Sequence, residues 1–231
     1  MHRLRVNVSE DVLDASALIA RANRLDFDRA RVRVVNFMGA PGAGKTSLLE
    51  RLLEGLEDVR VGVLASEAMG GLDARRLARF RAPVVRVHAG ALSFGGARHL
   101  DARIVRSALA QLPLLDLDIL VVENVGDFVC PAELGIGEHF RVMVSSVTED
   151  EDRPIKYPLV FRTCDLVLVN KVDLLPKFDF DLPLYLRHLD AVHPDVPRLE
   201  VSARSGRGIE AWRNWMIGLL EQREEQREVP V

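Results

Sequence analysis

A glycine-rich segment ends in a lysine and a threonine. Gly39–Thr46 has the sequence GAPGAGKT, which matches the pattern G-x-x-x-x-G-K-[ST] at every fixed position. Glycines in such a segment let backbone amides turn toward phosphate oxygens, and a following helix adds its dipole. We expect Lys45 to reach the β- and γ-phosphates of a nucleotide and the Thr46 hydroxyl to bind Mg²⁺. An ordinary glycine-rich turn is the alternative, but it does not account for the Lys-Thr pair.

A second polar segment, Asn170–Asp173, follows the apolar run Asp165–Val169 and has the sequence Asn-Lys-Val-Asp. A carboxylate at Asp173 can accept the N1 and N2 protons of guanine, whereas adenine offers neither. Lys171 can lay its stem over the base, and Asn170 can tie this segment to the glycine-rich one. Taken alone, these four residues are also compatible with a surface turn.

A third segment, Ser202–Arg204, follows the strand-like Arg198–Val201 and precedes a helical pattern. The backbone amide of Ala203 is expected to contact O6 of guanine. The three segments in this order favour GTP over ATP. The candidate nucleotide-binding residues are Gly39, Gly42, Ala43, Gly44, Lys45, Thr46, Ser47, Asn170, Lys171, Asp173, Ser202, Ala203 and Arg204.

Strand-like and helical patterns alternate along the chain, which predicts an α/β fold. A mainly parallel sheet with helices on both faces, preceded by an N-terminal helix, is expected, as in P-loop NTPases. The nucleotide then belongs at the carboxyl ends of the strands. The predicted strands are Val32–Phe37, Val61–Leu64, Val84–Val87, Ile119–Val122, Val142–Ser146, Leu166–Asn170 and Leu199–Val201.

Both ends of the chain have helical patterns. Ser9 is predicted to cap a helix that extends to about Leu25. Its expected apolar stripe is Val12, Ala15, Ile19 and Ala22. Glu221–Glu228 is expected to be a solvated, fraying helix end. We predict a single P-loop GTPase domain over 1–231, with an N-terminal helix in 1–30 and a charged tail in 216–231.

The composition narrows the class of protein. The chain has 231 residues, of which 48% are hydrophobic, and a net charge of −3. This is enough for one substantial core. Acidic and basic residues are interspersed, which argues against nucleic-acid binding. The two cysteines, Cys130 and Cys164, do not suggest a disulfide framework. No apolar run approaches a membrane span, and no secretory signal follows the first residues, so a cytoplasmic protein is expected.

The segment Glu123–Glu133, with the sequence ENVGDFVCPAE, narrows the class further. It resembles the switch region of the hydrogenase nickel-incorporation GTPases, the hydrogenase maturation protein B family. The resemblance runs from the N-terminal helix to about Trp215. It includes Leu134–His139, Ser146–Glu149, Asp152–Pro158 and Asp173–Pro176. The stretch Glu123–Pro158 separates this family from the related urease GTPases.

This resemblance implies a GTPase that forms a homodimer in response to GTP and helps load Ni²⁺ into a [NiFe]-hydrogenase. The implied partners are a small zinc- and nickel-binding maturation protein and the hydrogenase large subunit. The resemblance also implies catalytic and Mg²⁺ roles for Glu123, a Mg²⁺-shell role for Glu67, and an amide of Gly126 at the γ-phosphate. Asp73 is expected to position water, although it also fits a solvated helix-end charge. Because the sequence has no evident arginine finger, turnover should be slow.

A metal site at the dimer interface is also implied, but this chain departs from the family there. The family carries a Cys-His pair and a second cysteine, which meet across the dimer and bind Zn²⁺ or Ni²⁺. Here His99 and Cys130 remain, whereas Arg98 stands in place of the first cysteine. Arginine cannot ligate a metal, and its charge repels one. Two histidines and two cysteines still make a tetrahedral Zn²⁺ set, so a retained site and a lost site both stay open.

The remaining histidines and cysteine have structural interpretations. His139 is expected to be a structural residue rather than a support for the Cys-Pro segment. His88 is predicted to pack on a strand, and His188 and His193 to lie on the surface. Cys164 is predicted to be a small buried residue.

Three other functions are compatible with parts of the pattern. The Arg98 replacement motivates a GTPase switch without its own metal, which gates a nickel-carrying partner. A GTPase chaperone for cofactor insertion into another metalloenzyme, such as a cobalamin-dependent mutase, is disfavoured by the Cys-Pro segment. A nucleotide kinase is disfavoured by Asn170–Asp173 and by the lack of an evident lid.

Overall fold

The computed structural model describes residues 8–66, 76–77, 79–80, 82–87, 100–125 and 135–225. Within these residues a seven-stranded sheet has the order β3-β2-β4-β1-β5-β6-β7, and every neighbouring pair is parallel. The strands are β1 (Arg33–Gly39), β2 (Val61–Ser66), β3 (Val84–Val87), β4 (Ile119–Val125), β5 (Phe140–Ser146), β6 (Leu166–Asn170) and β7 (Arg198–Glu200). All seven strand predictions are confirmed, as is the mainly parallel sheet.

The central strands are apolar because both of their faces are covered. All five residues of β6 are buried, and β1 is buried at six of its seven positions. Parallel sheets with helices on both faces have such near-continuous apolar strands. Because neighbouring strands are parallel, the carboxyl ends of β1, β4 and β6 lie at the same edge of the sheet.

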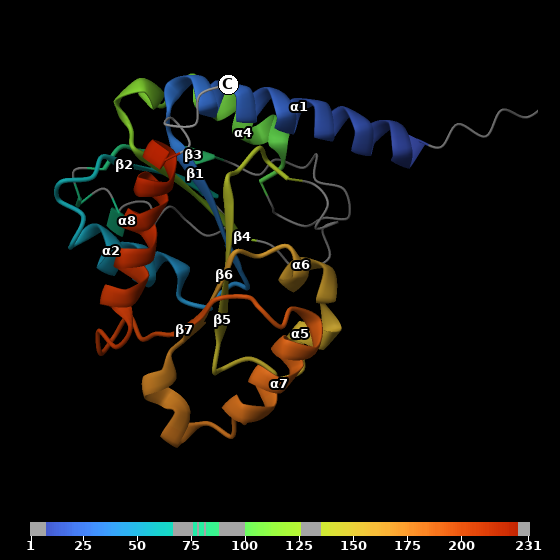
Figure 1. Cartoon of the computed structure of the whole chain (residues 1–231), viewed down its shortest axis with the longest axis vertical. Helices are drawn as coiled ribbons and strands as arrows, with labels where there is room; N and C mark the ends of the chain where they lie inside the picture. Colours follow the sequence, from blue (N-terminus) through green and yellow to red (C-terminus); the bar gives the residue numbers. More distant parts are fainter. Residues whose placement is uncertain are drawn as a thin grey trace, which may run out of the picture.

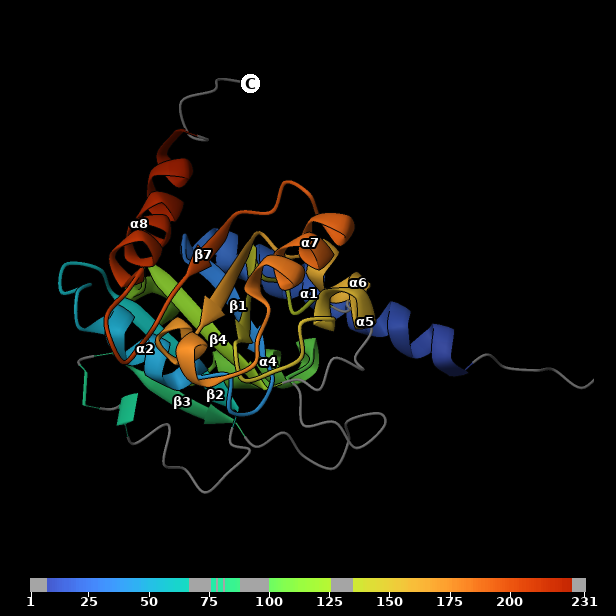
Figure 2. The ribbon, with the colours of Figure 1, turned by 90° about the horizontal axis from the view of Figure 1, so that it is seen from below.

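Two groups of helices cover the two faces (Figures 1 and 2). On one face α2 (Lys45–Leu53) packs beside α8 (Ile209–Glu225), and the ring of Phe37 stacks on Trp212 with centroids 5.4 Å apart. The other face carries α1 (Val8–Ala30) and α4 (Ala102–Leu109) over one half. Its other half carries α5 (Arg153–Lys156), α6 (Pro158–Arg162) and α7 (Leu182–Val192). Two short 3₁₀ helices, η2 (Leu114–Asp116) and η3 (Val172–Lys177), complete the described elements.

Helix α1 is longer than predicted at both ends. It begins at Val8, so Ser9 lies inside the helix, and it ends at Ala30 rather than near Leu25. The extra turn persists because Phe27 is fully buried in the core. The helix ends where Arg31 adopts a left-handed conformation, φ +58°, which arginine seldom favours. No glycine or asparagine therefore marks this end in the sequence.

The predicted apolar stripe of α1 is also wrong. Ala15 is exposed, Ile19 and Ala22 are half-buried, and the buried positions are Ser16, Asn23 and Phe27. (The Val12 side chain lies outside the described residues.) Asn23 is buried because its side-chain amide donates to the carbonyls of Ala102, at 2.9 Å, and Ile136, at 3.0 Å. A hydrogen-bonded asparagine on the packed face is invisible to an apolar pattern.

The segment 135–139 holds α1 against the sheet. Gly137 has φ +96°, and a Cβ there would lie 2.5 Å from the carbonyl oxygen of Ala20. The Nδ1 atom of His139 accepts from the Val34 amide at 3.0 Å, so Nε2 carries the proton and donates to Asp28 at 2.9 Å. Desolvation by burial lowers the pKa of His139 to about 4, which outweighs the hydrogen bond to Asp28. His139 is therefore a neutral structural histidine, as predicted.

The other predicted structural residues divide into two groups. Cys164 is buried and its thiol donates to the Val160 carbonyl, which confirms the prediction. His188 and His193 are half-buried and hydrogen-bonded to the carbonyls of Glu151 and Phe161, so their assignment to the surface was wrong. Both pack because α7 lies against α5 and α6. His88 lies outside the described residues.

Helix α8 continues to Glu225 and buries Met216 and Leu219 in the core. The charged part of the chain therefore begins after these residues rather than at position 216. Among the helices of the described residues, none combines the length and the apolar composition that a membrane span requires.

Candidate nucleotide-binding site

The glycine-rich segment forms a loop between β1 and α2. Gly42 and Gly44 have φ of +81° and +96°, a conformation that residues with a Cβ rarely adopt. Lys45 is the first residue of α2, and its ammonium donates to the carbonyls of Gly39, at 2.8 Å, and Ala40, at 3.0 Å. Backbone amides at the start of a helix and a lysine over the loop are the groups that bind nucleotide phosphates.

A hydroxyl and a carboxylate meet beside this loop. Thr46 Oγ1 donates to Glu123 Oε1 at 2.7 Å, and both residues are more than 90% buried. Glu123 reaches this position because β4 pairs with β1, which sets Glu123 opposite Phe37. Oxygen donors of this kind are those that Mg²⁺ prefers, so the two residues fit a Mg²⁺ ion.

The second polar segment is joined directly to the loop. Asn170 ends β6, and its side-chain amide donates to the Ala43 carbonyl at 2.8 Å. A Cβ on Gly44 would lie 2.4 Å from that amide nitrogen, so only glycine fits there. Lys171 follows with φ +64° and donates to the Gly42 carbonyl at 2.6 Å. The left-handed conformation costs about 1–2 kcal/mol in a residue with a side chain, and such strain is common where a side chain must be aimed.

The third segment orients the carboxylate of the second. The Ser202 hydroxyl donates to Asp173 Oδ1 at 2.6 Å and accepts from the Ser205 amide at 3.0 Å. Ser202 is fully buried, whereas Asp173 is only partly buried. The serine thus holds one oxygen of Asp173 and leaves the carboxylate at the wall of a pocket.

That pocket lies between α2 and the two later segments and has a volume of about 480 Å³. It is large enough for a purine base and ribose. Its lining residues are Gly44, Ser47, Glu50, Arg51, Glu54, Asn170, Lys171, Asp173, Leu174, Ala203 and Arg204.

Comparison with known proteins identifies the family. Residues 33–198 match the family model described as "CobW/HypB/UreG, nucleotide-binding domain". Over 215 residues the chain is 40% identical to the hydrogenase maturation factor HypB of Escherichia coli (strain K12), covering 93% of this chain and 72% of that protein. The chain belongs to the HypB hydrogenase maturation factors.

Two solved HypB structures agree with the fold. The crystal structure of HypB from Archaeoglobus fulgidus has a TM-score of 0.82 at 31% identity, covering 90% of this chain and 99% of that chain. HypB from Helicobacter pylori, solved in complex with nickel, also has a TM-score of 0.82, at 27% identity, covering 94% and 99%. The P-loop NTPase fold is therefore confirmed, and it supports nucleotide hydrolysis in general.

Several residues implied by the HypB resemblance lie outside the described residues. These are Glu67, Asp73, Arg98, His99, Gly126 and Cys130. Their roles remain predictions. Within the described parts of the chain, no group of three or more His, Cys, Asp or Glu side chains is arranged to hold a metal ion.

Sequence reasoning missed Arg51 as a residue of this pocket. Its Nε atom donates to the Ala203 carbonyl at 2.7 Å, and its Nη1 atom pairs with Glu54 at 3.0 Å. Arg51 thereby ties α2 to the segment expected to contact guanine O6. Its only signal in the sequence is its place in the helix after the glycine-rich loop, a place common to many surface arginines.

Proposed function

We propose that this HypB-family chain binds and hydrolyses GTP as an accessory protein for nickel insertion into [NiFe]-hydrogenase. The observation that carries the GTP assignment is the hydrogen bond from Asn170 to Ala43, which joins the guanine segment to the phosphate loop in one pocket. The hydrogenase role is supported by the 40% identity to a hydrogenase maturation factor. Nickel is supported by the complex of the Helicobacter pylori relative.

The proposed roles of the site residues are to bind the guanine base, the phosphates and Mg²⁺. Asp173 accepts from guanine N1 and N2, Ala203 donates its amide to O6, and Lys45 neutralises charge on the β- and γ-phosphates. Thr46 and Glu123 hold Mg²⁺, which neutralises phosphate charge when bound, and Glu67 contributes to its shell.

We further propose roles for two switch residues in GTP hydrolysis, and a slow rate for that reaction. Gly126 donates its amide to the γ-phosphate, and Asp73 orients the attacking water. Turnover is slow, because the sequence supplies no evident arginine finger. In this role, GTP hydrolysis sets the time at which the metal is delivered.

Metal delivery is proposed to occur in the cytoplasm from a GTP-dependent homodimer. His99 and Cys130 from two copies would provide two imidazoles and two thiolates for Ni²⁺ or Zn²⁺. Two partners would take part in this delivery. One is a small maturation protein that binds nickel and zinc, and the other is the hydrogenase large subunit.

Arg98 favours a second candidate function. Its guanidinium beside the expected metal ligands repels a cation, so the protein would act as a GTPase switch that gates a nickel-carrying partner.

Titration of the purified protein with Ni²⁺ and Zn²⁺ distinguishes the two functions. It is performed with GDP or a non-hydrolysable GTP analogue while the mass in solution is recorded. A metal-bound dimer weakened by Cys130→Ala and His99→Ala supports delivery from this chain. A GTP-driven dimer without metal supports the switch. Unimpaired hydrogenase maturation after deletion of the gene would contradict both.

A further inference from the structure

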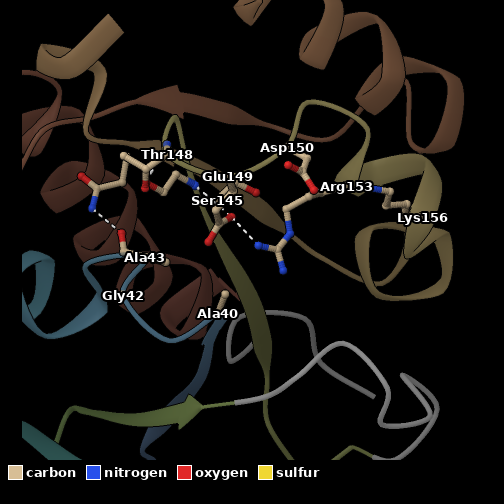
Figure 3. A network of polar contacts seen from close by, with 12 residues as sticks. Ala40, Gly42, Ala43, Ser145, Thr148, Glu149, Asp150, Arg153 and Lys156 are labelled. Atoms are coloured by element: carbon tan, nitrogen blue, oxygen red, sulfur yellow. Dashed lines mark hydrogen bonds and ion pairs between the residues drawn. The ribbon is translucent and has the colours of Figure 1, made fainter. Parts of the chain in front are cut away.

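A polar network extends from the phosphate loop to helix α5 and includes residues to which the proposed function gives no role. It contains the segment Ser146–Glu149, which begins at the last residue of β5, and Arg153 on α5. Figure 3 shows Thr148, Glu149 and Arg153 of this network. The contact nearest the nucleotide pocket joins Lys171 to Thr148. The Lys171 ammonium donates to Thr148 Oγ1 at 3.2 Å and to the Gly42 carbonyl at 2.6 Å.

Thr148 is itself held in one orientation. Its Oγ1 atom lies 2.8 Å from Ser146 Oγ, and its backbone amide donates to the same Ser146 oxygen at 3.3 Å. An ammonium can only donate, so Thr148 Oγ1 accepts from Lys171 and has its own proton available for Ser146. The threonine hydroxyl thus lies between the Ser146 hydroxyl and the Lys171 ammonium.

An ion pair between Glu149 and Arg153 stabilises the turn that carries Thr148. Glu149 accepts from the Ser146 amide at 3.3 Å and pairs with Arg153 at 2.9 Å. In Figure 3 the side chains of Glu149 and Arg153 point toward one another. Both are largely buried, with 11% and 15% of the side chains exposed, and the Arg153 guanidinium lies 5.8 Å from the centre of the Tyr157 ring.

The backbone also ties the turn to the guanine segment. The Val147 amide donates to the Asn170 carbonyl at 3.1 Å, directly before the left-handed Lys171. The position of Thr148 relative to Lys171 is therefore set by both backbone and side-chain contacts. A charge-assisted hydrogen bond to a hydroxyl oriented in this way restricts a long, flexible side chain.

We propose that Thr148 is a positioning residue for the nucleotide, because it holds the Lys171 stem where it covers the face of the guanine base. This inference rests on the proposed GTP-binding function. Lys171 covers the face of the base, whereas Asp173 binds its edge. Loss of the Thr148 hydroxyl therefore weakens binding of every nucleotide that Asp173 accepts by the same factor and leaves the choice between bases unchanged.

The test compares Thr148→Val with Thr148→Ser in the full-length protein. Affinities for GTP, GDP and inosine triphosphate, which lacks the N2 amino group, are measured by titration calorimetry. Thr148→Val is expected to weaken all three by about three- to tenfold, the effect of losing one typical hydrogen bond. Thr148→Ser is expected to restore most of the loss. Thr163→Val is the matched control, because the exposed Thr163 hydroxyl donates only to its own helix at Val160.

A second background tests whether Thr148 acts through Lys171. In Lys171→Met, the further change Thr148→Val is expected to alter GTP affinity by less than about twofold. Wild-type affinity in Thr148→Val would overturn the proposal. A changed ratio of GTP to inosine triphosphate affinity, or an undiminished effect in the Lys171→Met background, would also overturn it. Failure of the proposed function itself looks different, because the wild-type protein would then not bind GTP.

Discussion

The hydroxyl of Thr46 lies 2.7 Å from Oε1 of Glu123, although 77 positions separate the two residues in the chain. One comes from the first turn of α2 and the other from near the end of β4. Each is more than 90% buried, so this is a polar pair inside the protein rather than a surface contact. A buried carboxylate is costly unless it is bound by donors or a cation, and here it lies beside the phosphate loop.

Glu123→Gln tests whether this pair holds Mg²⁺. The amide keeps the shape and can accept from Thr46 but carries no charge. GTP turnover at saturating Mg²⁺ is expected to fall by about 10²-fold or more, and Mg²⁺ should no longer strengthen GTP binding. Glu57→Gln is the control, since Glu57 is an exposed glutamate. An unchanged Mg²⁺ dependence in Glu123→Gln would exclude Glu123 from the metal shell.

Asp173→Asn should change which base is bound. Xanthine carries a carbonyl at C2 where guanine carries an amino group, so an asparagine amide can donate to it. We expect GTP affinity to fall by about 10²-fold or more, while xanthosine triphosphate binds better than it does to wild type. The exposed Asp195→Asn serves as control. Equal GTP affinity in Asp173→Asn and wild type would show that another group reads the base.

Gly44→Ala should separate the two nucleotide-binding segments. The new Cβ would lie 2.4 Å from the Asn170 amide nitrogen, at a residue whose φ is +96°. We expect GDP binding to fall by about 10²-fold because the loop and Asn170 cannot both keep their positions. Gly218→Ala is the control, because its Cβ meets nothing within 4 Å and should stabilise α8 by about 0.5–1 kcal/mol. Wild-type GDP affinity in Gly44→Ala would contradict this geometry.

The lowered pKa of His139 predicts that the free energy of unfolding depends on pH. Its pKa is about 4 in the folded protein, below the ordinary value of 6.5, so the unfolded chain binds the proton first as pH falls. The stabilisation is therefore present above pH 6.5 and is lost between about pH 6.5 and pH 4, up to about 3 kcal/mol. Urea denaturation of wild type and His139→Asn should show a stability difference that shrinks across this range. A difference independent of pH would mean that His139 does not titrate this way.

The sequence predicted the sheet and the nucleotide segments because both depend on local chemistry. Strand β6 is apolar throughout, and Gly42 and Gly44 adopt conformations that favour glycine. Asn170 and Asp173 line the predicted pocket and Ser202 holds Asp173 in place, because each of the three closely follows or ends a strand.

What the sequence did not predict depends on contacts between distant residues. Asn23 is buried through carbonyls of Ala102 and Ile136, 79 and 113 positions away, so no local pattern marks it. Helix α1 ends at Arg31, whose left-handed backbone carries no glycine signal. Arg51 reaches Ala203 across 152 positions, and its role is visible only once α2 lies beside the last loop.

The most direct test of the account is turnover of GTP and ATP by the purified protein with Mg²⁺, beside Lys45→Ala. The exposed Lys177→Ala serves as control. We predict slow hydrolysis of GTP by wild type and Lys177→Ala, no more than about 1% of that rate with ATP, and no detectable turnover by Lys45→Ala. Equal rates with ATP and GTP would contradict guanine recognition by Asp173. Full turnover by Lys45→Ala would contradict the phosphate loop as the catalytic site.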